Sequence, residues 1–399
     1  MKCLTIISLI AICICGGVLG RVVNDDVIVQ LNRPRRQAWR WKNGVMGSRT
    51  ISYYFQSNLN YEIQYLFMGA IRAWEKDTCV KFVNNKTASS MQVGAFSRGG
   101  CYHQGNGKTS WLNAGCGHLA GITHEVGHAI GLGHTHNRHD RDKYLNMDWG
   151  NVERGFYDIS RANPLMTLQV YKDQYKPMTQ EQNDNYDVPY DYGSIMHYGV
   201  PQRNPAMAPI DEKYFRTIGS PIISFIDLVM VNKHYKCEEL CHSKNPPPCA
   251  RGGFPNPNDC STCVCPVGYG GSLCNDMPVD CSESQTVTAT KEWNQVQRNA
   301  LNMNGDRYSY FRCTSWIKSP EGTKIEVEIA DINSHVEKIG CVLAGIEIKT
   351  QKDQRLTGYR YCFNSDRNVK LRSESNIVPI ITYAIDGAVY TTLRYRYVE

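Results

Sequence analysis

The sequence predicts an α+β domain, then a short cysteine-rich segment, then a β-sandwich, and three observations support this prediction. The first half of the chain mixes helix-period segments with strands rich in β-branched and aromatic residues. Seven of the 17 cysteines lie from Cys237 to Cys274, among frequent Pro and Gly. After Cys281, short runs alternate apolar and polar residues. A chain of 399 residues is long enough for two or more domains.

The N-terminal segment has the features of a secretory signal. Lys2 precedes an apolar run over residues 4–19, and the run ends in small residues up to Gly20. We therefore expect residues 1–20 to be a signal peptide and the protein to be secreted, with an uncleaved membrane anchor as the alternative. No later segment has the ~18–20 apolar residues that span a bilayer, so no other membrane span is expected.

Residues 21–36 are short and polar and end in Arg33-Pro34-Arg35-Arg36. This basic cluster predicts a propeptide that is cut by a processing protease, and the alternative is a solvated run of charge. Residues 1–36 carry half of the formal net charge of +6. The remaining charge is too small, and too scattered, for a nucleic-acid partner.

Cysteine usage indicates an oxidising compartment. Three of the 17 cysteines lie in the signal (Cys3, Cys13 and Cys15), which leaves 14, an even number. We expect seven disulfides, as is typical of secreted proteins. Asn85-Lys86-Thr87 is a sequon for N-glycosylation and agrees with secretion, although such triplets also occur by chance.

Local periodicity predicts the secondary structure of the first half of the chain. Strands are expected at residues 50–54, 80–83 and 91–96, and helices at residues 61–76, 119–130 and 225–235. Asn58 or Asn60 can cap the first helix, and Gly131 can end the second. Elsewhere between residues 140 and 236 little periodicity is found. We therefore expect a helix packed on a small mixed sheet, followed by a second helix.

The last third of the chain is predicted to be all-β. Strands are expected at residues 316–317, 324–329, 345–348, 378–383 and 389–393. Turn residues separate these runs, which is typical of a β-sandwich. The cysteine-rich segment before them contains Pro246-Pro247-Pro248. It is too short and too polar to bury a core, so disulfides must hold it together.

The sequence His124-Glu125-Val126-Gly127-His128 predicts a metal site. Residues four apart share one face of a helix, so both imidazoles can reach one ion. Gly131 then ends the helix, and the chain can return with His134 as a third ligand. Three imidazoles leave a position open for water, which is typical of catalytic rather than structural zinc. Zinc lowers the pKa of water from ~16 towards ~7, and Glu125 can take the proton.

The alternative is that these histidines lie on a core or surface helix without a metal. His134 at its offset argues against that alternative. A second element supports the site: Ser194-Ile195-Met196-His197-Tyr198 stands between Gly193 and Gly199, so a tight turn is expected. A Met near a Gly is usually a core residue, but beside a zinc motif it predicts an apolar floor below the metal. Tyr198 can then reach the metal or donate to an oxyanion.

The run from His124 to Asp142, together with Ser194-Ile195-Met196-His197-Tyr198, resembles the astacin family of zinc endopeptidases, and the modular layout resembles that of nematode astacins. The resemblance implies a zincin-type (metzincin) catalytic domain over residues 37–237 that binds one Zn²⁺ ion. The implied roles are metal ligands His124, His128 and His134, general base Glu125, Met-turn Met196, and Tyr198 as a fifth ligand that moves to stabilise the oxyanion.

Two further resemblances cover the rest of the chain. Residues 238–275 resemble an EGF-like module, and residues 281–399 are similar to a CUB domain. Such modules bind protein partners or position substrates. The three resemblances together imply seven disulfides: Cys79–Cys237, Cys101–Cys116, Cys241–Cys260, Cys249–Cys263, Cys265–Cys274, Cys281–Cys313 and Cys341–Cys362.

Three positions depart from the astacin pattern. Thr135 stands where the family has a Glu that anchors the mature N-terminus. Ser220 follows Ile218-Gly219 where relatives often have a basic residue, so no preference for acidic substrates is expected. The segment between Cys101 and Cys116 is shorter than usual. Asp26 is the nearest match to the family's latency ligand, and a solvated acidic pair explains it equally well.

The combined prediction is a secreted zinc-dependent endopeptidase that is made as a zymogen and hydrolyses peptide bonds of extracellular proteins, for which matrix or cuticle proteins are plausible. A zinc-activated water attacks the substrate, with Glu125 as general base, and the substrate pairs with the sheet edge near residues 91–96. One alternative is a secreted matrix or adhesion protein with structural zinc, but such a site needs no base. The other is a zinc hydrolase of small molecules, which the modular tail argues against.

Overall fold

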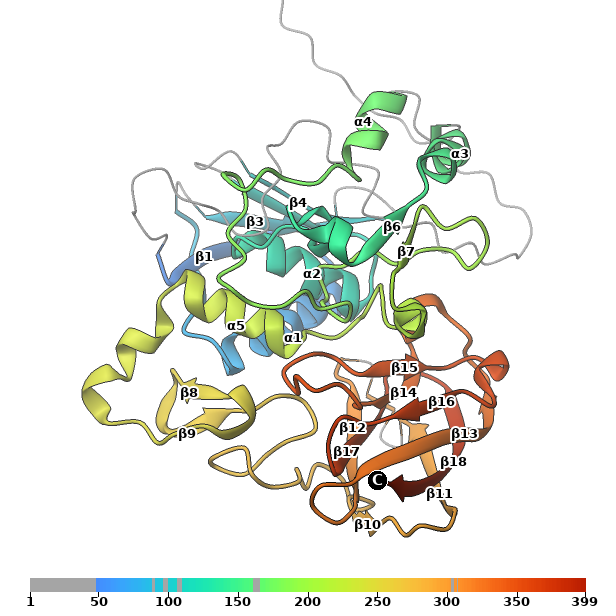
Figure 1. Ribbon diagram of the computed structural model, residues 1–399. Coiled ribbons are helices and arrows are strands. Elements are labelled where there is room, and N and C mark those ends of the chain that lie inside the picture. Colours follow the sequence, from blue (N-terminus) through green and yellow to red (C-terminus); the bar gives the residue numbers. More distant parts are fainter. Residues whose placement is uncertain are drawn as a thin grey trace, which may run out of the picture.

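The computed structural model describes residues 48–87, 90–95, 100–105, 110–160, 166–302, 305–306 and 308–399. The predicted signal, propeptide and Asp26 lie outside the described residues. The described chain forms an α+β domain, a small hairpin segment and a β-sandwich (Figure 1). The predicted fold class is therefore confirmed. Within these residues no helix has the length and apolar character needed to cross a membrane.

A five-stranded mixed sheet forms one layer of the α+β domain. Its strand order is β2 (Lys81–Asn84), β1 (Thr50–Phe55), β3 (Met91–Gly94), β5 (Ser110–Ala114) and β4 (Cys101–Gly105). The first four strands are parallel, and β4 is antiparallel to β5. The edge next to β5 is therefore β4. The expectation that residues 91–96 form the substrate edge is wrong, because β3 pairs with a strand on each side. Periodicity identifies a strand but not its neighbours.

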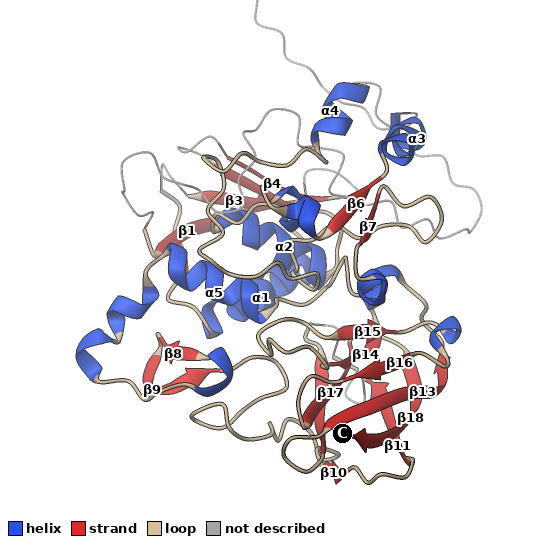
Figure 2. Ribbon diagram, viewed as in Figure 1, coloured by secondary structure: helices blue, strands red, loops and turns tan. Residues whose placement is uncertain are grey.

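Helices α1 (Tyr61–Lys76), α2 (Leu119–Ala129) and α5 (Phe225–His234) lie together on one side of this sheet (Figure 2). The Asn60 side chain caps α1 by accepting from the Glu62 amide at 2.8 Å, as one of the two predicted caps. Trp74 is fully buried, and its indole N–H donates to the Thr123 carbonyl at 3.0 Å. This bond fixes α1 against the helix that carries the predicted metal ligands.

The segment between α2 and α5 contains elements that periodicity did not predict. They are β6 (Leu145–Met147), α3 (Trp149–Ser160), α4 (Leu168–Asp173) and β7 (Met207–Pro209). Their core combines aliphatic and Met side chains with a layer of buried tyrosines: Tyr171, Tyr175, Tyr190, Tyr192, Tyr198 and Tyr214. Tyrosines stacked across loops produce no repeating apolar pattern along the chain, so periodicity contains no signal for this core.

The β-sandwich consists of two packed sheets. One has the order β10 (Thr286–Thr288), β12 (Phe311–Lys318), β17 (Ile377–Ala384), β14 (Ala344–Ile348) and β15 (Tyr359–Tyr361). The other has the order β11 (Asn294–Leu301), β18 (Ala388–Val398), β13 (Lys324–Ser334) and β16 (Lys370–Arg372). Buried branched side chains such as Ile329 and Ile346 fill the space between them. The predicted β-sandwich is confirmed.

Disulfides join the parts of the chain that have little core. The seven bonds link the same cysteine pairs that the resemblances imply. Three of them hold the segment around the hairpin of β8 (Phe254–Asn256) and β9 (Asp259–Val264). Another, Cys79–Cys237, ties the end of α1 to the residues that follow α5. Covalent links therefore replace hydrophobic packing in this short segment.

The sandwich contacts the α+β domain through buried charge. Arg360 and Glu347 both belong to the sandwich, are almost fully buried, and form an ion pair with an Nε–Oε2 distance of 2.9 Å. Arg360 also crosses to the α+β domain, where its Nη1 donates to the Ser220 hydroxyl at 2.6 Å. Its backbone N–H donates to the Thr217 hydroxyl at 3.0 Å. The ion pair thus forms part of the domain contact.

Arg360→Met is expected to lower the free energy of unfolding by about 3–5 kcal/mol, because it leaves Glu347 buried without its partner. Urea unfolding of the full chain measures the loss. Arg367→Met is the matched control: Arg367 pairs with Asp331 at the exposed surface, and its loss should cost at most about 1 kcal/mol. Equal losses in the two variants would contradict this account of the buried pair.

Candidate metal centre

Three histidines converge beside α2. His124 and His128 lie one helical turn apart on that helix, and His134 follows its end. The Nε2 atom of His134 is 3.3 Å from the Nε2 of His124 and 3.1 Å from the Nε2 of His128. The structure therefore brings the three predicted ligands to one point.

Hydrogen bonds at the opposite ring nitrogens set the tautomers. The Nδ1 of His124 is 2.6 Å from the Ile195 carbonyl, and the Nδ1 of His128 is 2.7 Å from the Leu132 carbonyl. A carbonyl oxygen can only accept, so both Nδ1 atoms must carry the proton. Each Nε2 consequently directs a lone pair towards His134. This arrangement orients imidazoles for a metal ion.

The three imidazoles fit a zinc ion. Zn–N bonds of about 2.0–2.1 Å at tetrahedral angles require nitrogen atoms about 3.3 Å apart. The two observed Nε2 separations, 3.3 and 3.1 Å, are close to that requirement. Neutral imidazole is a preferred ligand of zinc. The residues present therefore fit one zinc ion.

A glycine ends α2 and allows the third ligand to return. Gly131 has a φ of +98°, a conformation that costs little without a side chain. Its N–H donates to the His128 carbonyl, and the Leu132 N–H donates to the Gly127 carbonyl, both at 3.0 Å. These bonds satisfy the last carbonyls of the helix. The chain then reverses within a few residues and delivers His134.

Glu125 and Tyr198 both lie in this site. Glu125 is 2% exposed and is next to His124 on α2. Tyr198 is equally buried, and its ring lies 4.2 Å from the ring of His134 and 4.2 Å from that of His136. His136, which sequence reasoning left without a specific role, therefore packs behind a predicted ligand. Its position two residues after His134 was the one feature of the sequence that could have placed His136 near the metal centre.

Met196 packs directly against the metal-binding helix. A Cβ atom at Gly127 would lie 2.6 Å from the Met196 sulfur, so any side chain there would force Met196 to shift. The glycine within the histidine motif thus lets Met196 approach the helix closely. The Met196 carbonyl also accepts from the Thr135 N–H at 2.9 Å. Residues 191–199 are here called the Met loop. Through Met196 this loop contacts α2, which precedes His134, and Thr135, which follows it.

A buried network around Asp227 supports the Met loop. Asp227 accepts from the Ser194 hydroxyl at 2.5 Å and from the Ile195 N–H at 2.9 Å. Ser194 in turn accepts from the Thr135 hydroxyl at 2.8 Å. Asp227 also forms a capping box with Ser224 at the start of α5. Asp227 was not predicted from the sequence, although the Ser-x-x-Asp spacing at the start of a predicted helix was a usable signal.

The residues after His134 are anchored inside the domain. The guanidinium of Arg138 pairs with Asp140 at 2.8 Å and donates to the Val188 carbonyl at 3.2 Å. Arg141 is also buried, and its Nη1 donates to the Tyr175 carbonyl at 2.7 Å. These side chains hold the turn after the third ligand. Three of the charged residues that follow His134, namely Arg138, Asp140 and Arg141, therefore have a structural role.

Burial raises the pKa of Asp227 to about 6, even though hydrogen bonds from Ser194, Ser224 and Ile195 favour its charged form. An unfolded Asp has a pKa of about 3.9. Between these values the folded state holds a proton that the unfolded state has lost. The contribution of Asp227 to stability is therefore present at low pH and falls as the pH rises through about 6.

Relative to Asp227→Asn, the wild type should lose about 2 kcal/mol of unfolding free energy between pH 4 and pH 7. Urea unfolding of zinc-free protein across this range measures the difference, and chelation removes the effect of metal binding. Asp386→Asn, at an exposed carboxylate of the β-sandwich, controls for the change of charge alone. A pH-independent difference for Asp227→Asn would show that burial does not dominate at this carboxylate.

Comparison with known proteins identifies the family. The sequence model described as Astacin, a peptidase family, matches residues 35–236. Zinc metalloproteinase nas-31 of Caenorhabditis elegans is 35% identical over 390 residues, which cover 94% of this chain and 60% of that protein. This chain thus spans less than two thirds of nas-31. Zinc metalloproteinase nas-25 of the same organism is 32% identical, with 91% of this chain and 89% of that protein covered.

Among solved structures, the hatching enzyme zinc-protease HCE-1 (high choriolytic enzyme 1) of Oryzias latipes is 26% identical, covers 50% of this chain and 94% of its own, and has a TM-score of 0.39. The family match spans half of this chain, and the alignment with nas-25 covers about nine tenths of each protein. This protein belongs to the astacin family of peptidases.

Proposed function

We propose that this protein is a secreted zinc-dependent endopeptidase that hydrolyses peptide bonds of extracellular proteins and is made as a zymogen. The observation that carries the proposal is the convergence of His124, His128 and His134, with Glu125 buried beside them. Membership of the astacin family supports it. A structural zinc site usually has four protein ligands. Within the described residues the cluster contains three, which favours catalysis.

The site residues divide the chemistry among them. A bound zinc ion would supply a Lewis acid that acidifies water and polarises a carbonyl. Glu125 accepts a proton from the attacking water molecule and delivers it to the leaving amine, so the carboxylate is regenerated after each cycle. The Tyr198 hydroxyl donates to the oxyanion that develops on the substrate carbonyl. His124 and His128 keep fixed tautomers through their Nδ1 bonds.

The substrate lies along β4, in place of the β3 segment expected from sequence. An extended peptide can add main-chain hydrogen bonds only at a free edge, and β4 pairs with β5 alone among the described strands. The disulfide Cys101–Cys116 joins the start of β4 to the residues just before α2. This link keeps the edge strand close to the helix that carries Glu125.

The remaining parts of the chain serve secretion, latency and partner binding. Residues 1–20 act as a signal and residues 21–36 as a propeptide, with Asp26 as the latency ligand. Seven disulfides support an extracellular location. Asn85 is exposed and can carry a glycan. We assign residues 37–237 to the catalytic domain, 238–275 to an EGF-like module and 281–399 to a CUB-like domain that binds protein partners or substrates.

Glu125→Gln should lower kcat/KM for a fluorogenic peptide by about 10²–10⁴-fold, because proton transfer is lost while the ligands remain. The variant should retain one zinc ion per chain by metal analysis. Glu62→Gln changes an exposed glutamate on α1 and should leave activity unchanged. A zinc-loaded Glu125→Gln variant that cleaves as fast as the wild type would rule out Glu125 as the base.

Tyr198→Phe should lower kcat by about 10²-fold with little change in KM, because the hydroxyl acts mainly when the oxyanion forms. Steady-state kinetics on one peptide separate the two constants. Tyr171→Phe removes another buried hydroxyl of the tyrosine layer and serves as the control. A rise in KM at constant kcat would assign Tyr198 to substrate binding instead.

A further inference from the structure

We propose that the C-terminal β-sandwich positions the metal centre by clamping both ends of the Met loop (residues 191–199). Thr357 holds the loop at its start through Asp191, and Gly340 supports it at its end. Both residues belong to the sandwich and act through the loop, so they are positioning residues. The expected effect on kcat rests on the proposed function. The position of the Met loop does not, because it can be measured without activity.

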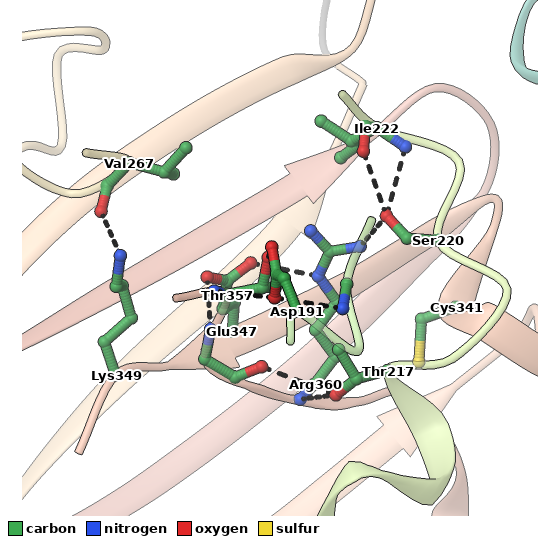
Figure 3. A network of polar contacts seen from close by, with 12 residues as sticks. Asp191, Thr217, Ser220, Ile222, Val267, Cys341, Glu347, Lys349, Thr357 and Arg360 are labelled. Carbon is green, nitrogen blue, oxygen red and sulfur yellow. Dashed lines mark hydrogen bonds and ion pairs between the residues drawn. The ribbon is translucent and has the colours of Figure 1, made fainter. Parts of the chain in front are cut away.

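The first contact is a shared carboxylate. The Thr357 N–H donates to Asp191 Oδ1 at 3.1 Å, and the Thr357 hydroxyl donates to Oδ2 at 3.0 Å. Within the loop, the Gly193 N–H donates to the same Oδ1 at 3.2 Å. Asp191 and Thr357 are both buried, and Figure 3 shows them side by side in the network. One carboxylate therefore joins the sandwich to the residues just before Met196.

Gly193 allows this contact to form. A Cβ atom there would lie 2.3 Å from the Thr357 Cγ2, so no other residue fits while Thr357 is in place. The φ of Gly193 is not positive, so its backbone does not itself require glycine. The sequence predicted a turn from this glycine. The structure instead gives close approach of the sandwich as the reason for it.

A stack of three glycines forms the second contact. A Cβ at Gly340 would lie 2.1 Å from the Gly219 carbonyl oxygen, and a Cβ at Gly219 would lie 2.6 Å from the Gly199 Cα. Backbone therefore packs on backbone from the sandwich to the last residue of the Met loop. The disulfide Cys341–Cys362 holds the chain next to Gly340. This end of the loop cannot move outward without displacing the sandwich.

Thr357 is itself held rigidly. The N–H of the next residue, Gly358, donates to Glu347 Oε1 at 2.8 Å, and Glu347 pairs with Arg360. Arg360 bonds to Ser220 across the contact. On the other side, Lys349 Nζ donates to the Val267 carbonyl at 2.8 Å, and burial lowers the pKa of this lysine to about 8 (Figure 3). The clamp thus stands on a buried polar network with satisfied partners.

The Met loop transmits the clamp to the ligands. Its Ile195 carbonyl accepts from His124 Nδ1, and its Met196 sulfur lies against Gly127 in α2. A shift of the loop would therefore tilt one imidazole and loosen the floor of the site. Catalytic geometry tolerates little displacement. Without the clamp, we expect a loop that samples more conformations and an enzyme with a lower kcat.

Thr357→Val in the full chain tests the clamp. It keeps the methyl contact with Gly193 but leaves one Asp191 oxygen without its donor. In zinc-free protein, hydrogen exchange of the Ile195 and Met196 amides should become about tenfold faster, because the loop opens locally. In zinc-loaded protein, kcat should fall by a similar factor at constant KM. Thr357→Ser, which retains the hydroxyl, should restore both values.

Thr382→Val is the matched control. Thr382 is a buried sandwich threonine whose hydroxyl donates to the Cys313 carbonyl within the sandwich. It should leave exchange in the Met loop and kcat unchanged. Equal exchange of the Ile195 and Met196 amides in Thr357→Val and Thr382→Val would overturn the clamp. If the wild type cleaves no peptide, the proposed function fails, but the exchange comparison still decides whether the clamp exists.

A second pair of variants covers the case in which Thr357→Val does not fold. Gly193→Ala should speed exchange in the Met loop, because its methyl group meets Thr357. Gly193→Ala/Thr357→Gly removes both the methyl clash and the Thr357 side chain, so its exchange should match that of Thr357→Gly alone. If Gly193→Ala is equally disruptive with and without the Thr357 side chain, the sandwich is not what constrains this glycine, and the proposal is wrong.

Discussion

The Met loop depends on two buried carboxylates. It has no regular secondary structure, so no strand or helix satisfies its backbone N–H groups. Asp191 accepts the Gly193 N–H, and Asp227 accepts the Ile195 N–H. Burial raises the pKa of both acids, which means that desolvating them opposes folding. Hydrogen bonds to these carboxylates offset that cost and leave the loop with one conformation. The position of Met196 below the metal centre follows from them.

Local sequence patterns were sufficient to predict the elements whose periodicity, caps or motif lie within one short segment of chain. The helices at residues 61–76 and 119–130, and the metal motif on the second, could be predicted because periodicity, caps and ligand spacing lie within a few turns of chain. The strand order could not, because pairing joins residues far apart: β4 precedes β5 in the chain yet forms the edge. Asp191 could not be predicted either, because two of its hydrogen-bond donors, the N–H and the hydroxyl of Thr357, lie 166 residues later.

The two glycines beside Met196 were recognised in the sequence as important, but the structure gives a different reason for them. Gly193 and Gly199 predicted a tight turn, and the structure shows that neither residue has a positive φ. What they share is that a side chain would meet another part of the protein: Thr357 at Gly193, and Gly219 at Gly199. Glycine allows close approach as well as unusual dihedral angles. The sequence alone does not distinguish these two reasons, because the approaching segment is remote.

The departures from the astacin pattern are consistent with the same packing. Relatives often have a basic residue at the position of Ser220. Here the Ser220 hydroxyl accepts from Arg360, so the basic group beside this position comes from the sandwich. The Thr135 hydroxyl donates to Ser194, whose own hydrogen is already committed to Asp227. A hydroxyl has one hydrogen to give, so a carboxylate at position 135 would find no donor in Ser194 and would add charge beside Asp227. Threonine supplies the missing donor, and the side chain that replaces the family's glutamate thereby becomes part of the support for the Met loop.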